Sequence, residues 1–67
     1  MGYREARELA RIRHELRERL MSCHHEGADD LLARLRATAE RFALVAPELG
    51  GEYERWRFRF ELLAHGT

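Results

Sequence analysis

The sequence predicts an all-α fold: a small three-helix bundle, built from a helical hairpin plus a third helix and completed by oligomerisation. Gly27, Pro47 and the Gly50–Gly51 pair divide the chain into three segments rich in Ala, Leu, Arg and Glu, which favour helices. In each segment apolar residues recur at steps of three and four, as along one face of an α-helix. The length of 67 residues allows one domain, residues 1–67.

The first predicted helix runs from about Tyr3 to His25, and Gly27 is suited to end it. Its apolar stripe consists of Leu9, Ile12, Leu16, Leu20 and Cys23. Arginines four residues apart, such as Arg13 and Arg17, repel each other at a cost of a few tenths of a kcal/mol unless a carboxylate from another element lies between them. The sequence therefore leaves room for an ion pair between this helix and a neighbour.

The second predicted helix covers residues 28–46, with Asp29 and Asp30 in its first turn, where the helix dipole favours acidic groups. One apolar stripe consists of Leu31, Leu35, Thr38, Phe42 and Val45, and a second of Leu32, Ala39 and Ala46. A face this broad covers more than one neighbour. We therefore expect this helix to lie centrally, between the other two.

The third segment, residues 47–64, is open to two interpretations. A helical stripe consists of Leu49, Tyr53, Trp56, Phe60 and Leu63. Residues 56–62 also alternate strictly between apolar and charged, which is typical of a strand. We favour the helix because the rest of the chain offers no second strand, so a strand would need a partner chain. Pro47 suits the first turn of a helix, although the two glycines could delay its start to Glu52.

The predicted core combines one face from each segment. It contains Leu9, Leu16, Leu20, Leu31, Leu35, Phe42 and Phe60. A chain of this length buries only about 60% of its unfolded surface, so a core of this size is marginal without further support. A second copy would supply that support, and we expect a symmetric homodimer.

We expect this chain to act as a non-enzymatic protein-interaction module, a small regulatory or accessory protein that binds itself, a larger protein or both. Large apolar residues on the outer side of the third helix motivate this expectation, because such residues invite a partner surface. The expected interface consists of Leu32, Ala39, Trp56, Phe58, Arg59 and Leu62.

The alternative function is that of a small nucleic-acid-binding regulator. Arginines and aromatic residues together bind phosphates and stack on bases. The candidate residues are Arg4, Arg7, Arg11, Arg55, Arg57 and Arg59. Twelve basic and twelve acidic residues give no net charge, which argues against binding by bulk electrostatics.

We expect neither catalysis nor a cofactor. The run Cys23-His24-His25-Glu26 contains metal-ligating residue types, but adjacent helical residues point about 100° apart and cannot converge on one ion. His14 and Glu18 share a stripe with His25, so only two copies meeting across a symmetry axis would build a metal site. The sequence therefore predicts no metal centre within one chain.

A cytoplasmic location without membrane contact is the remaining expectation. Cys23 is the only cysteine, which excludes an internal disulfide and fits a reducing compartment. No apolar run approaches the roughly 20 residues that span a bilayer. The first residues carry charge instead of the apolar region of a secretory signal.

Overall fold

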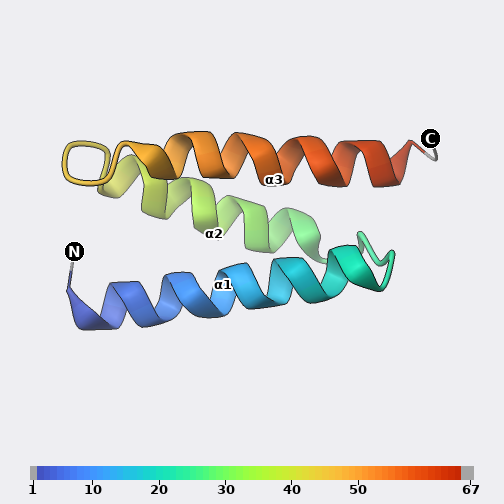
Figure 1. Cartoon of the computed structure of the whole chain (residues 1–67), viewed down its shortest axis with the longest axis horizontal. Coiled ribbons are helices and arrows are strands. Elements are labelled where there is room, and N and C mark those ends of the chain that lie inside the picture. Colours follow the sequence, from blue (N-terminus) through green and yellow to red (C-terminus); the bar gives the residue numbers. More distant parts are fainter. Residues whose placement is uncertain (1, 66–67) are drawn as a thin grey trace.

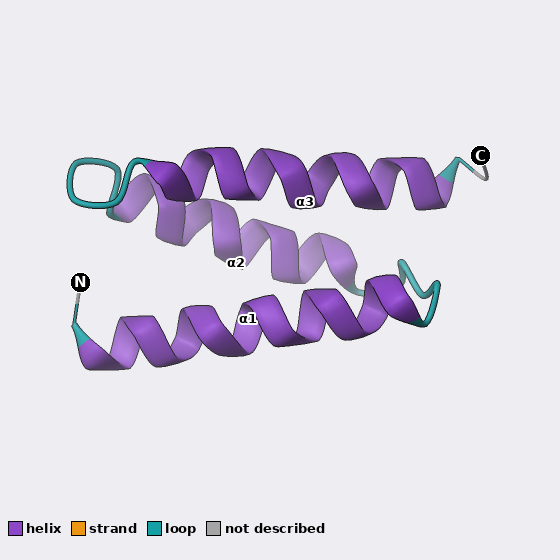
Figure 2. Cartoon of the chain, in the orientation of Figure 1, coloured by secondary structure: helices purple, strands orange, loops and turns teal. Residues whose placement is uncertain are grey.

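Three α-helices make up the protein in a computed structural model that describes residues 2–65. Helix α1 spans Tyr3–Met21, α2 spans Ala28–Arg41 and α3 spans Glu48–Ala64 (Figures 1 and 2). No strand occurs within residues 2–65. The predicted all-α three-helix fold is thus confirmed, and the helical interpretation of the third segment holds over its whole length.

Helix α2 lies between its two neighbours, as its broad apolar face predicts. It contacts α3 most extensively and α1 somewhat less, while α1 and α3 contact each other least. Figure 1 shows the turn after α1 and the end of α3 at one end of the bundle, with the α2–α3 connection at the other. The result is elongated, with principal extents of 36 × 18 × 15 Å.

One apolar cluster fills the space between the helices. Its buried members are Leu9, Ile12, Leu16, Ala28, Leu31, Leu32, Leu35, Ala39, Ala46, Leu49, Trp56 and Phe60. Five of the seven predicted core residues belong to it. Leu20 and Phe42, the other two, are only partly buried and pack against the cluster from the ends of their helices. A helix end has neighbours on fewer sides, so these two side chains remain partly exposed.

Helix α1 ends at Met21, four residues before the predicted end at His25. The backbone N–H of Ser22 still donates to the carbonyl of Glu18, but Cys23 adopts a left-handed conformation with φ of 58°. Gly27 is also left-handed, with φ of 78°, and immediately precedes α2. Two left-handed residues reverse the chain between the helices, so the helical pattern cannot continue through them.

Helix α2 ends at Arg41, so the prediction that it reaches Ala46 was wrong. Residues 42–45 form turns, and Leu44 and Val45 point into solvent, so Val45 does not continue the predicted apolar stripe. Pro47 disfavours the helical conformation for the residue before it, which helps to explain why the helix stops early. Ala46 is nevertheless buried, because the turn brings it back against the core.

Helix α3 begins at Glu48 and continues through Gly50 and Gly51, so the glycines do not delay its start to Glu52. Pro47 precedes the first helical residue with φ of −62°, close to helical geometry. Burial of Leu49 at the second helical residue anchors this first turn to the core. Packing therefore outweighs the poor helix propensity of the two glycines.

Candidate interaction surfaces

The outer face of α3 carries the most exposed pair of large apolar residues on one helix face. Phe58 is 60% exposed and Leu62 is 42% exposed. They are four residues apart, so their side chains are neighbours on the helix surface. Trp56 and Phe60, which flank Phe58 in the sequence, are both buried on the opposite side of the helix. This face therefore points away from the core of its own chain.

The remaining expected interface residues are placed differently. Leu32 and Ala39 of α2 and Trp56 of α3 are buried within the single chain. Leu31, Leu35, Leu32 and Ala39, the large part of both apolar stripes that falls within α2, are buried in the single chain, so the breadth of this face gives no reason to invoke a second copy. Arg59 is exposed, with its guanidinium carbon 5.3 Å from the centre of the Trp56 ring. Of the six residues, only Phe58, Arg59 and Leu62 lie on the accessible outer side of α3.

An ion pair that sequence reasoning missed connects α1 to α3. Arg13 donates two hydrogen bonds to Glu52, from Nε to Oε2 and from Nη2 to Oε1, each 2.6 Å long. This two-pronged geometry is the strongest that a guanidinium and a carboxylate form. The side chain of Glu52 is only 16% exposed, whereas that of Arg13 is 41% exposed. The pair bridges the two helices that contact each other least.

The surroundings of Glu52 favour its charged form. Hydrogen bonding from Arg13 lowers the pKa of Glu52, and this effect outweighs the opposing effect of burial. A hydrogen bond from Trp56 and the positive charge of Arg55 lower the pKa further. Glu52 is thus ionised at neutral pH, and Arg13, Glu52, Trp56 and Arg59 form one connected polar cluster beside the core.

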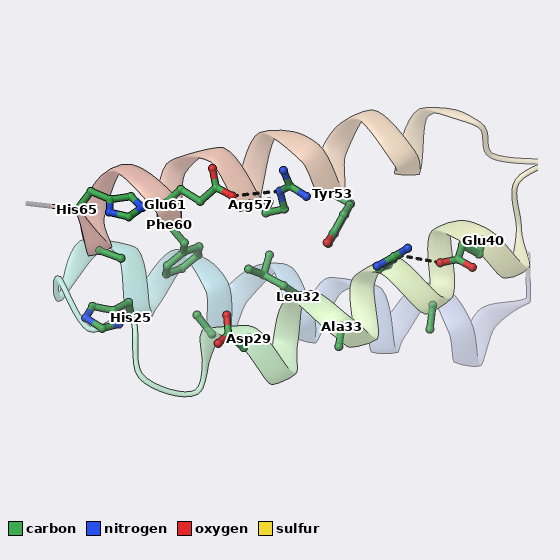
Figure 3. Close-up of a pocket in the computed structure, with 14 residues that line it drawn as sticks. His25, Asp29, Leu32, Ala33, Glu40, Tyr53, Arg57, Phe60, Glu61 and His65 are labelled. Atoms are coloured by element: carbon green, nitrogen blue, oxygen red, sulfur yellow. Dashed lines mark hydrogen bonds and ion pairs between the residues drawn. The ribbon is translucent and has the colours of Figure 1, made fainter. Parts of the chain in front are cut away.

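A groove runs between α2 and α3, with two adjoining hollows of about 680 and 510 Å³. Leu32, Phe60 and Tyr53 line its first hollow, with small alanines along the α2 side (Figure 3). Its rims are charged, and the charges pair along each helix: Arg36 with Glu40 at 3.0 Å and Arg57 with Glu61 at 3.4 Å. The groove is therefore an open channel, and these charged side chains on its rims form ion pairs within their own helices.

The arginines expected to bind nucleic acid are divided between different parts of the surface. Arg4, Arg7 and Arg11 of α1 border one hollow of about 410 Å³ together with Arg34 of α2. On α3, Arg57 lies beside the groove and pairs with Glu54 as well as with Glu61. The fold therefore does not bring all six arginines to one surface.

The histidines and the cysteine lie at exposed positions. His14 lies 4.0 Å from Glu18 on the exposed side of α1, and Cys23 is exposed in the turn that follows. His25 and His65 line the same end of the α2–α3 groove (Figure 3). Within residues 2–65 no three His, Cys, Asp or Glu side chains are grouped so that they could hold a metal ion.

None of the helices within residues 2–65 is long and apolar enough to cross a membrane. The fold and surfaces define a three-helix bundle with one outward apolar helix face. The chain matches no protein-family model, and no curated protein or solved structure matches it.

Proposed function

We propose that this chain is a non-enzymatic helical protein-interaction module, a small regulatory or accessory protein that acts as a homodimer in the cytoplasm. The observation that carries the proposal is the exposed pair Phe58 and Leu62 on the outer face of α3. Apolar area removed from water contributes about 25 cal/mol per Å². A two-fold contact would bury this pair on both copies at once.

The shape of the bundle supports a further contact. Its accessible surface is 5042 Å², compared with about 4,400 Å² for a typical folded monomer of 7.9 kDa. The elongated form leaves α3, 17 residues and thus about 25 Å long, open along its outer side. A second copy on this side would bury part of the extra surface.

The open groove and the single thiol support the other parts of the proposal. Along the α2–α3 groove, Arg36 pairs with Glu40 and Arg57 pairs with Glu61, so these four charged side chains are engaged with each other along their own helices. An exposed free cysteine such as Cys23 suits a reducing compartment.

The test replaces Phe58 and Leu62 together by Glu. Both positions face outward, so we expect the Phe58→Glu/Leu62→Glu variant to remain helical by circular dichroism while its mass in light scattering falls to that of a monomer. If the dimer is obligate, the variant unfolds instead, and its melting temperature falls with the loss of the dimer. The matched control is Leu44→Glu. Leu44 is 98% exposed in the turn between α2 and α3, away from the outer face of α3, so this variant should leave the dimer intact. A double variant with wild-type mass and wild-type melting temperature would refute this interface.

A second candidate function is nucleic-acid binding, favoured by the gathering of Arg4, Arg7 and Arg11 with Arg34 around one hollow. Such binding would weaken steeply as salt is raised, because bound arginines release counterions from the phosphates. Fluorescence polarisation with labelled duplex and single-stranded DNA at 50 and about 200 mM salt tests it. Saturable, salt-dependent binding that Arg7→Ala and Arg11→Ala reduce would favour this function over the first.

A further inference from the structure

We propose that the groove between α2 and α3 binds an amphipathic helix of a different protein, one that carries basic residues at both ends of its contact. Neither Phe58 nor Leu62 lines this groove, so the partner helix would occupy a second surface of the interaction module. Two features lead to this partner: the apolar channel itself and the full set of charges that line it.

The groove is long enough to hold a helix of about four turns. Its two hollows, of about 680 and 510 Å³, share four lining residues: Arg36, Glu40, Tyr53 and Arg57. They therefore form one continuous channel. His25 and His65 line one end of it (Figure 3), and Pro47 lines the other, so the channel follows the whole of α2. The 14 residues of α2 extend over about 21 Å, which is also the length of four turns of a partner helix.

Small residues line the channel along its length. The exposed ones are Ala33, Ala37, Ala43, Gly50 and Ala64. Leu32 and Phe60, which are buried, close the first hollow from below. The distance between the axes of packed helices depends on the side chains at the contact, so alanines and a glycine let a partner helix approach closely. An apolar helix face laid into such a groove is a recurrent form of peptide recognition.

The charges that line the channel are predominantly acidic. Four carboxylates face two guanidinium groups there, which gives the channel a net charge of −2 when its two histidines are neutral. These six residues are Asp29, Glu40, Glu54, Glu61, Arg36 and Arg57. The whole chain, in contrast, has no net charge. The acidic excess of the channel therefore favours a basic partner.

The acidic excess lies at the two ends of the channel. Asp29 and Glu61 line only the hollow that ends at the histidines, and Glu54 lines only the other hollow. Both arginines lie in the shared middle. Asp29 takes part in no ion pair among residues 2–65, whereas Glu54 and Glu61 share the single guanidinium of Arg57. A complementary helix therefore carries basic residues at both ends and no basic residue in between.

A second copy of this chain does not meet this requirement. If two channels faced each other across a two-fold axis, each acidic end would meet an acidic end, whichever way the channels ran. Arg36 and Arg57 of the two copies would also meet in the middle. Such like-charge contacts oppose association. Insertion of the outer face of α3 into the channel of another copy would be a head-to-tail contact, which leads to open chains or rings instead of a closed dimer.

Synthetic helices test the chemistry of the partner. The probe is a fluorescently labelled peptide of about 18 residues, because shorter isolated helices are marginally stable. It has leucine and alanine on one face, lysine in its first and last turns and glutamine elsewhere. A second peptide has glutamate in place of lysine, and a third contains the residues of the first in an order that has no apolar face. By fluorescence anisotropy, we expect the full chain to bind the first peptide at least about tenfold more tightly than either of the others.

Neutralising carboxylates locates the contact. The variant Asp29→Asn/Glu54→Gln/Glu61→Gln should raise the dissociation constant of the basic peptide about tenfold, because three exposed opposite-charge contacts are lost together. The matched control removes the same number of charges from exposed positions of α1, outside the channel, in the variant Glu8→Gln/Glu15→Gln/Glu18→Gln. This control should change the dissociation constant by less than about twofold. Circular dichroism checks that both variants remain helical.

Four outcomes would overturn the helix-binding groove. The basic peptide does not bind, the acidic or reordered peptide binds as tightly, or the α1 control weakens binding as much as the channel variant does. In the fourth, the channel variant alters the mass of the chain in light scattering without peptide, which would place a second copy in the channel. A wild-type chain that is monomeric at high micromolar concentration overturns the homodimer and leaves the groove as proposed, so the two proposals fail separately.

Discussion

Removing the guanidinium of Arg13 would test what holds α1 to α3. Arg13 and Glu52 join two helices that otherwise contact each other little, through two hydrogen bonds of 2.6 Å. Hydrogen bonds to charged groups contribute about 1.5–3 kcal/mol when buried, whereas exposed ion pairs contribute about 0–1 kcal/mol. Glu52 is mostly buried and Arg13 is 41% exposed, so we expect a coupling free energy of about 1–2 kcal/mol.

A double-mutant cycle isolates this coupling. It compares Arg13→Ala, Glu52→Ala and the double variant by urea unfolding at pH 7. The total stability expected for a chain of this length is about 3–10 kcal/mol, so the loss of the pair is a measurable fraction of it. Arg13→Ala should destabilise more than Arg17→Ala, the control on the same helix, because it leaves the mostly buried carboxylate of Glu52 without its main partner. A coupling below about 0.3 kcal/mol would contradict the assigned role of the pair.

The same pair makes stability depend on pH in a defined direction. The pKa of Glu52 is lower in the folded chain than its usual 4.5, chiefly because Arg13 donates hydrogen bonds to it. The unfolded chain therefore takes up a proton at higher pH than the folded chain does. The contribution is complete above the unfolded pKa and is lost as pH falls through the lower, folded pKa. The measured coupling should accordingly shrink between about pH 5 and pH 3, and a coupling that does not change over this range would refute an ionic origin.

Three further predictions concern the bundle itself. Leu35 is fully buried, so Leu35→Ala should cost about 2–5 kcal/mol in urea unfolding, whereas Leu44→Ala at an exposed turn should change stability by less than about 0.5 kcal/mol. Gly50→Ala should stabilise the chain by about 0.5–1 kcal/mol, because the added methyl group meets no atom within 4 Å and alanine is the better helix former. Gly27→Ala should act in the opposite direction, by about 1 kcal/mol, because the residue has φ of 78° and the methyl group would lie 3.2 Å from Arg19. A melting temperature that moves the same way in both glycine variants would contradict the assigned backbone conformations.

The repeat of apolar residues predicts the three helices because helix formation here is mainly a matter of burying one face of each segment. Leu35 and Phe60, for example, are core residues that the three-and-four spacing alone identifies. The ends of the helices are less predictable. Val45 fits the seam of α2 by spacing, yet the chain turns at residue 42 and leaves it exposed. The spacing of apolar residues predicts which residues share a face of a helix, but it does not predict where the helix ends.

The contact between Arg13 and Glu52 shows a second limit of prediction from the sequence. The like-charge spacing of Arg13 and Arg17 signals that a carboxylate from elsewhere would help, but the sequence does not identify Glu52 as its source. Glu52 lies 39 positions away, and only the packing of α3 beside α1 brings the groups together. Likewise, the broad face of α2 predicts its central position, while the extent to which α1 and α3 cover Leu32 and Ala39 depends on tertiary packing.

The mass of the wild-type chain in solution tests the central proposal most directly. Sedimentation equilibrium at several concentrations up to high micromolar should give a mass approaching twice the chain mass of 7.9 kDa, with a shift toward the single chain on dilution. A mass of one chain at every concentration would contradict the homodimer, and the outward pair Phe58 and Leu62 would then have to face a different protein.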